Sequence, residues 1–214
     1  MVTFILVRHG YSAFNKTRKF SGQCDVPLDE IGRLQAADTA KYILSNYGID
    51  TIVSSDLSRA LDTAKPIADA LGLPIKLDED LRELNTGDWT GLTFVEIAAR
   101  YPESFALYCD NVGYSRPDGG ESYEELIARA TRAMIRIAAE NEGKTVLVST
   151  HGGFIRCLRC ALLGVALDEV KNVPHVANAS VSVCEYENGE GRFTLVGYKD
   201  HLTNGTTEFR VSVV

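Results

Sequence analysis

The chain has 214 residues, of which 45% are hydrophobic and 24% are charged, with a net charge of −7 and five cysteines. This balance is typical of a folded globular protein and argues against a disordered chain. The acidic charge predicts no nucleic-acid binding, the short apolar runs predict no membrane span, and the odd cysteine count favours a reduced, cytoplasmic setting.

Strands and helices are predicted to alternate along the chain. The N-terminal MVTFILVRHG lacks the basic start and the cleavage site of a signal peptide, so its apolar run is predicted to be a strand. Buried strands are predicted at 3–7, 51–55 and 145–150, and two more at 180–187 and 192–198 around the turn Asn188-Gly189. Helices are predicted within 27–48, 55–72, 119–143 and 154–164, and residues 74–84 are predicted to be extended.

Capping residues and apolar stripes set the expected helix ends and buried faces. In 119–143, Ser122 and Glu125 form a capping-box pattern. The helix after 51–55 is expected to begin at Ser55 or Asp56 and to end at Gly72. In the first helix, the apolar stripe predicts a buried face made of Ile31, Leu34, Ala37, Ala40, Ile43, Leu44 and Tyr47.

The alternation predicts an α/β fold with a mostly parallel sheet covered by helices on both faces. No linker-like stretch divides the chain, so a single domain over 1–214 is predicted. Residues 85–120 lack a strand pattern, and 92–111 suit one or two short helices broken at Pro102. We expect 85–120 to cap a functional site.

Two His-Gly pairs follow two of the predicted strands. His9 follows 3–7 and His151 follows 145–150, while Arg59 comes shortly after 51–55. Ligands of open parallel sheets bind where the carboxyl ends of the strands meet. A lone histidine at a strand end is more often a solvated loop residue, but the coincidence predicts that Arg8, His9, Arg59 and His151 share one crevice.

An ordered set of segments resembles the histidine phosphatase superfamily, which includes the cofactor-dependent phosphoglycerate mutases. The segments are RHG at 8–10, SGQCDVPLDEIG at 21–32, SSDLSRALDTA at 54–64, LRELNTGDWTG at 81–91, PDGGES at 117–122 and VSTHGG at 148–153. The resemblance implies a phosphoglycerate mutase-like three-layer sandwich. It also implies phosphoryl transfer through a phosphohistidine, without a metal or other cofactor.

The resemblance assigns roles to particular residues. His9 matches the nucleophile, Glu83 the proton donor to the leaving alcohol, and His151 a second catalytic histidine. The phosphate would be held by Arg8, Asn15, Arg59 and His151. Further substrate contacts are expected from Tyr11, Ser21, Gly22 and Gly152. The nucleophile needs an unprotonated ring nitrogen, with an acceptor that fixes its other nitrogen.

Several departures favour a phosphatase over a mutase. Tyr11 replaces a glutamate found in the mutases and in many of the phosphatases, and it is expected to form a pocket wall rather than to donate a hydrogen bond. Thr86 stands where the mutases have a tyrosine, and Gly153 where they have an asparagine. Their paired substrate-binding arginines have no match in 92–115 beyond Arg100. The prediction is a phosphomonoesterase acting on a small anionic phosphorylated metabolite. The alternative is a mutase, which would need 2,3-bisphosphoglycerate.

Other classes of protein fit the sequence less well. A binding module that has lost catalysis is disfavoured because all the core groups are present, and a metal or redox protein because Cys157 and Cys160 lie in a helical pattern. Trp89 is expected to pack in the core. The substrate alcohol, the oligomeric state, a homodimer included, and the role of the tail 203–214 stay open.

Overall fold

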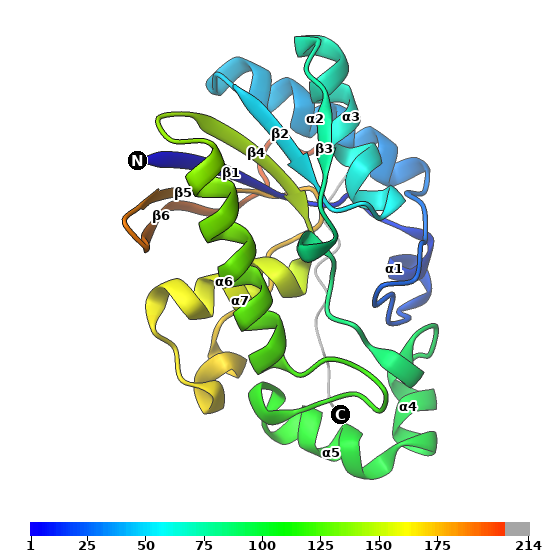
Figure 1. Ribbon diagram of the computed structural model, residues 1–214. Coiled ribbons are helices and arrows are strands. Elements are labelled where there is room, and N and C mark those ends of the chain that lie inside the picture. Colours follow the sequence, from blue (N-terminus) through cyan, green and yellow to red (C-terminus); the bar gives the residue numbers. More distant parts are fainter. Residues whose placement is uncertain (204–214) are drawn as a thin grey trace.

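The computed structural model describes residues 1–203 as a twisted sheet with helices on both faces (Figure 1). In this part of the chain the strand order is β3-β2-β4-β1-β5-β6. The strands are β1 (Val2–Arg8), β2 (Thr51–Ser54), β3 (Ile75–Leu77), β4 (Thr145–Thr150), β5 (Val181–Glu187) and β6 (Glu190–Tyr198). β1 to β4 pair in parallel, whereas β5 and β6 are antiparallel to their neighbours. The predicted three-layer, mostly parallel architecture is confirmed.

Helices follow the strands in all the predicted regions, and the short helix α1 was not predicted. They are α1 (Ala13–Thr17), α2 (Glu30–Asn46), α3 (Ser58–Leu71), α4 (Phe94–Arg100), α5 (Pro102–Asp110), α6 (Tyr123–Glu140) and α7 (Gly152–Leu163). Short 3₁₀ turns are η1 (Glu79–Leu81), η2 (Gly87–Trp89), η3 (Val112–Tyr114) and η4 (Leu167–Asn172). No helix within residues 1–203 is long and apolar enough to cross a membrane.

Alternate residues of the central strands pack into two separate cores. Phe4 and Leu6 of β1 face α6 and α7, whereas Ile5 and Val7 face α2 and α3. Figure 1 shows these two helix pairs on opposite sides of the sheet. Because side chains alternate along a strand, an apolar run with both faces covered must be continuously apolar. This is why FILV sits at the centre of the fold.

The buried face of α2 differs from the prediction. Ile31, Leu34 and Leu44 are exposed, and the buried residues are Gly32, Gln35, Ala36, Thr39, Ala40 and Ile43. The helix is rotated about its axis relative to the prediction, and two hydrogen bonds explain why. Gln35 Oε1 accepts the Tyr11 N–H at 2.9 Å, and Thr39 Oγ1 donates to the Ala179 carbonyl at 2.9 Å. A Cβ on Gly32 would lie 2.0 Å from the Tyr11 carbonyl oxygen, so only glycine allows this approach.

The ends of α3 were predicted only in part. Gly72 ends the helix in the left-handed conformation, as expected. The N-cap is Leu57 rather than Ser55 or Asp56. The Ser58 N–H is accepted instead by Asp25 Oδ1 at 2.8 Å, from a distant loop. Single-sequence capping rules miss such a long-range cap.

Residues 85–120 contain no strand and hold α4 and α5, broken at Pro102 as predicted. In Figure 1 these two helices lie apart from the sheet. Trp89 is fully buried, as expected, and its ring contacts those of Phe20, Phe105 and Tyr108. An aromatic cluster therefore anchors this region. Its role as a cap and the single-domain organisation stay predictions.

The N-terminus of α6 offers a test of local stability. Ser122 Oγ accepts the Glu125 N–H at 3.1 Å, and the Glu125 carboxylate accepts the Ser122 N–H at 2.9 Å, which confirms the capping box. Ser122→Ala is expected to lower the free energy of unfolding by about 1 kcal/mol. Urea unfolding measures this. The exposed control Ser45→Ala, within α2, should change it by less than about 0.5 kcal/mol.

Candidate active site

The carboxyl ends of β2, β4 and β1 lie side by side and bring three chain segments together. Ser54 pairs with Ser149, and Arg8 pairs with Thr150. The next residues of β4 and β1 are His151 and His9, whose ring centroids are 5.2 Å apart. Both histidines are buried. The convergence predicted from the two His-Gly pairs is therefore present.

His9 presents an unprotonated ring nitrogen. Its Nδ1 lies 2.7 Å from the Gly10 carbonyl oxygen, which can only accept, so the proton is on Nδ1 and Nε2 keeps its lone pair. Burial lowers the pKa of His9 well below 6.5, and the charges of Arg59 and Arg8 lower it further. The imidazole is thus neutral, as a nucleophile must be.

The hydrogen bond of His151 favours the same tautomer, with the proton on Nδ1. Its Nε2 lies 2.9 Å from Ser55 Oγ, which also accepts the Leu57 N–H at 3.4 Å. The Ser55 proton is then free to be donated to Nε2, which leaves the proton of His151 on Nδ1. Burial lowers the pKa of His151 well below 6.5, and Arg59, His9 and Arg8 add to the fall.

Arg8 and Arg59 are anchored by carbonyl groups. Arg8 Nη1 donates to the Val176 carbonyl at 2.6 Å. Arg59 is fully buried and donates to the carbonyls of Cys24 and Gly22, each at 2.8 Å. Burial lowers the pKa of both guanidinium groups, and the charge of Glu83 opposes this fall. Neither arginine has a carboxylate within ion-pair distance in residues 1–203.

Three buried N–H donors around His9 have no hydrogen-bond partner among the described residues. They are Arg8 Nε, Arg59 Nε and His151 Nδ1. Unpaired buried donors are rare and unfavourable, so their clustering is typical of a site built for an anion. The N-terminus of α7 starts directly after His151 and adds a favourable dipole. The arrangement suits a phosphoryl group.

Glu83 lies against the start of α7. Its Oε1 accepts the Leu84 N–H at 3.0 Å, and its Oε2 accepts the Gly153 N–H at 3.2 Å. A Cβ on Gly153 would lie 2.2 Å from Glu83 Oε1. The residue after Gly152 must therefore be small for the carboxylate to keep this position.

The remaining predicted residues differ in the contacts that they make near the two histidines. Asn15 Oδ1 accepts from the Ser12 N–H and hydroxyl at 3.0 and 2.9 Å, which leaves its amide nitrogen as a donor. A Cβ on Gly152 would lie 3.0 Å from Arg8 Nε, so Gly152 adjoins the anion donors. The Gly22 carbonyl is used by Arg59.

Tyr11 and Ser21 have backbone roles in the structure. The Tyr11 carbonyl accepts the Asp29 N–H at 3.1 Å, and the Ser21 carbonyl accepts the Cys24 N–H at 3.0 Å. Both residues are half-buried, and neither hydroxyl has a hydrogen-bond partner within residues 1–203. The choice between a pocket wall and a substrate hydrogen bond for Tyr11 stays a prediction.

Three supporting residues were missed at the sequence level. Ser55 fixes the tautomer of His151, Asn178 Nδ2 donates to the His9 carbonyl at 3.0 Å, and Arg129 Nη2 donates to the Glu83 carbonyl at 3.1 Å. Ser55 directly follows β2 beside the site, and that position was a usable signal. Asn178 and Arg129 come from distant segments, and nothing local marks them.

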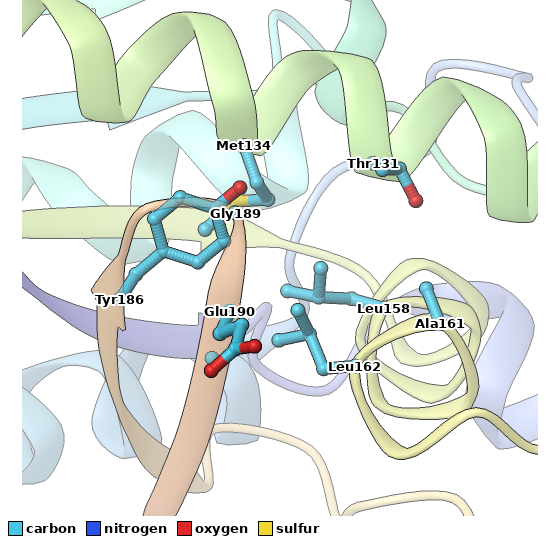
Figure 2. A pocket seen from close by; sticks show the side chains of 9 residues that line it. Thr131, Met134, Leu158, Ala161, Leu162, Tyr186, Gly189 and Glu190 are labelled. Carbon is cyan, nitrogen blue, oxygen red and sulfur yellow. The ribbon is translucent and has the colours of Figure 1, made fainter.

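Other features of the described part of the chain lie outside this site. A hollow of about 350 Å³ between α6, α7 and the β5–β6 turn is lined mainly by apolar side chains such as Met134, Leu158 and Leu162 (Figure 2). None of the predicted site residues lines it. Within residues 1–203, no three His, Cys, Asp or Glu side chains are grouped as metal ligands. Cys157 and Cys160 are buried free thiols in α7.

Comparison with known proteins identifies the family. The family model described as "Histidine phosphatase superfamily (branch 1)" matches residues 4–200. The chain belongs to the histidine phosphatase superfamily. The resemblance seen in the sequence is thereby confirmed.

Individual members of the superfamily resemble the chain over most of its length. It is 37% identical to the phosphoglycerate mutase-like protein 4 of Arabidopsis thaliana, with 87% of this chain and 80% of that protein covered. It is 34% identical to a glucosyl-3-phosphoglycerate phosphatase of Mycolicibacterium vanbaalenii, with 82% and 80% covered. The solved structure of Bacillus stearothermophilus YhfR matches with a TM-score of 0.89 and 32% identity, covering 94% of this chain and all of that one.

Some relatives are longer than this chain. A bifunctional protein of Mycobacterium tuberculosis is 38% identical over 202 residues, and the match covers 92% of this chain but 54% of that protein. The chain thus spans about half the length of that relative.

The two neutral histidines predict a dependence of stability on pH. Their pKa values are lowered in the folded state, so below about pH 6.5 the unfolded chain binds more protons than the folded chain. The free energy of unfolding should fall as the pH drops from 6.5 to 5.5, with each histidine contributing up to about 1.4 kcal/mol per unit. Urea unfolding in phosphate-free buffer measures the slope. His151→Asn should flatten it, and an unchanged slope would contradict the assignment.

Gly153→Ala separates activity from stability. The added Cβ would displace the Glu83 carboxylate, so we expect the turnover of phosphomonoesters to fall by about 10²-fold or more, the size of a general-acid contribution. Stability should be kept or raised, because alanine is favoured over glycine in a helix by about 1 kcal/mol. Parallel kinetics and thermal unfolding test both expectations. Full turnover in a folded variant would show that Glu83 need not occupy this position.

Proposed function

We propose that the chain is a metal-independent phosphomonoesterase that hydrolyses a small phosphorylated metabolite through a phosphohistidine on His9. The observation that carries this proposal is the set of three unpartnered buried donors around an unprotonated His9 Nε2. A neutral nucleophile facing donors for three oxygens suits an in-line attack on phosphorus. Relatives named as phosphatases support the choice of reaction.

The first half-reaction transfers the phosphoryl group to the enzyme. His9 Nε2 forms the new bond to phosphorus while the bond from phosphorus to the alcohol oxygen breaks, and Glu83 gives its proton to that oxygen. Arg8, Arg59 and His151 hold the equatorial oxygens, with Asn15 adding one amide donor. The charge of the two arginines would substitute for the metal ion of other phosphoryl-transfer sites.

The second half-reaction returns the enzyme to its starting state. Water attacks the phosphohistidine, Glu83 accepts a proton from the water, and the bond from phosphorus to Nε2 breaks to release inorganic phosphate. A mutase would instead return the phosphoryl group to the substrate. We propose hydrolysis because Tyr11, Thr86 and Gly153 depart from the mutase pattern.

We also propose a role for the region 85–120 and a cellular setting. Residues 85–120 would cap the crevice and contact the alcohol half of the substrate. The enzyme would need no cofactor and would act in the cytoplasm. Of the tail, residues 204–214 lie outside the described residues, and the oligomeric state stays open.

His9→Ala tests the proposal directly. In EDTA, the wild type is expected to release phosphate from an aryl phosphate, and His9→Ala should lose about 10³-fold or more of that rate. Phosphate labelled in the substrate should appear on the wild type as an acid-labile, base-stable adduct. His201→Ala is the control, because His201 bonds Thr39 and stacks on Tyr42, with no contact to the site.

Two results would redirect the proposal. Retained turnover in His9→Ala would remove the phosphohistidine mechanism. Rapid formation of 2-phosphoglycerate from 3-phosphoglycerate that depends on 2,3-bisphosphoglycerate would favour the mutase.

A further inference from the structure

Thr63 of α3 is fully buried, and its hydroxyl group contacts two different segments of the candidate active site. Its Oγ1 accepts the Gly10 N–H at 3.0 Å and lies 2.7 Å from the Arg59 carbonyl oxygen. Because an N–H group only donates and a carbonyl oxygen only accepts, the hydroxyl proton must point to Arg59. One hydroxyl group therefore joins the segment of His9 to the helix that carries the buried guanidinium.

The bond to Gly10 is not explained by the helix itself. A threonine within a helix commonly donates to the carbonyl four residues earlier, and the bond from Thr63 to Arg59 is of this kind. Thr131 of α6 makes the same local bond, to the Ile127 carbonyl at 2.8 Å. Thr63 adds a second bond, to a residue 53 positions earlier. In the described part of the chain, it is the one hydrogen bond that joins residues 9–11 directly to α3.

Gly10 is important because its backbone orients the nucleophile. The Gly10 carbonyl accepts the proton of His9 Nδ1 at 2.7 Å, which leaves the lone pair on Nε2. A Cβ on Gly10 would lie 2.6 Å from the Gly32 carbonyl oxygen, so this backbone is already pressed closely against α2. Thr63 holds the N–H of the same residue from α3. A shift of Gly10 would move the acceptor of the His9 ring and so change the direction of Nε2.

Arg59 is fixed at both ends of its side chain. Its guanidinium donates to the carbonyls of Gly22 and Cys24, each at 2.8 Å, and its own carbonyl accepts the Thr63 hydroxyl. The hydroxyl thus spans the two groups whose separation would decide whether a bound phosphorus lies in line with His9 Nε2. A displacement of about 1 Å in such a geometry can lower a rate by about 10²-fold.

We propose that Thr63 is a positioning residue that sets the distance and the angle between the His9 ring and the Arg59 guanidinium. It touches no reacting atom and acts through the backbones of Gly10 and Arg59. This inference rests on the proposed function, because it concerns how His9 is presented to phosphorus. A nucleophile and its donors are most effective when they are held in place before the reaction.

Thr63→Val tests the role of the hydroxyl group. Valine keeps the shape of the side chain but leaves the buried Gly10 N–H without its acceptor. The kcat/KM for an aryl phosphate, which reports the steps up to the phosphohistidine, should fall by about 10- to 100-fold. Thr63→Ser keeps the hydroxyl and should recover most of this loss. Equal losses in both variants would contradict the proposal. If Thr63→Val does not fold, Thr63→Ala removes the same hydroxyl and replaces it in the comparison.

Two control variants separate positioning from a general loss of stability. Thr131→Val removes only the local helical bond. Ile67→Val loosens the core side of α3, since Ile67 is fully buried one turn after Thr63. Measured at a temperature where every variant is folded, both controls should keep the wild-type kcat/KM. A loss in Ile67→Val as large as that in Thr63→Val would assign Thr63 a purely structural role and overturn the proposal.

A double-mutant cycle with Arg59→Lys measures whether Thr63 acts on the alignment of the two groups. Without the guanidinium there is no precise alignment with His9 to preserve, so Thr63→Val should then cost only about threefold or less in kcat/KM. A structural role would give the same fold-loss in both backgrounds. Equal losses in the wild type and in Arg59→Lys would therefore remove the positioning role.

Binding of inorganic phosphate distinguishes failure of this inference from failure of the proposed reaction. Calorimetry needs no turnover, and Thr63→Val should bind phosphate about 3- to 10-fold more weakly than the wild type, whereas Thr131→Val should not. Where the wild type hydrolyses aryl phosphates, the kinetic comparisons decide. Where it does not, a weaker affinity confined to Thr63→Val would keep the positioning role and remove the phosphatase proposal, and equal affinities would overturn both.

Discussion

The site depends on burying positive charge beside neutral imidazoles at the carboxyl end of a parallel sheet. Arg8 and Arg59 are held by backbone carbonyls rather than by carboxylates, so their charge is positioned but not neutralised. Burial lowers the pKa values of both histidines, and the same charges lower them further. An ion pair within the site would have reversed both effects. A carboxylate in direct contact would compete with a phosphate for the guanidinium groups and favour imidazolium over imidazole.

Contacts from the surrounding structure hold these buried charged groups in place. The backbone of residues 10–11 is packed against Gly32 and bonded by Gln35, and Asn178 donates to the His9 carbonyl. On the other side, Arg129 forms an ion pair with Glu121 and donates to the carbonyls of Asp80, Arg82 and Glu83. These contacts fix rotamers and loops that electrostatic repulsion would otherwise displace. Catalytic donors are most effective when they are held in place before the reaction.

The sequence predicted those features of the fold and of the site that follow from local residue patterns and from the set of segments that resemble the family. The sheet, the alternation of helices and the convergence of His9 with His151 followed from apolar runs that end in His-Gly. The predicted buried face of α2 was wrong because Gln35 and Thr39 point inward and form hydrogen bonds to backbone groups of distant segments. The predicted N-cap of α3 was wrong for the same reason, since the Ser58 N–H at the start of the helix is accepted by Asp25 from a distant loop. Periodicity detects apolar faces, but it cannot detect a polar residue whose partner lies far away in the chain.

The same limit applies to the charged side chains of the helices. Arg156 and Arg159 of α7 donate to the carbonyls of Val170 and Pro174, which lie 14 and 15 residues further along the chain. Arg129 of α6 instead forms an ion pair with Glu121, eight residues earlier. A carboxylate partner offsets the positive charge of a guanidinium, whereas carbonyl groups fix its position and leave the charge in place. Which of these holds for a given arginine depends on contacts that a local sequence pattern does not contain.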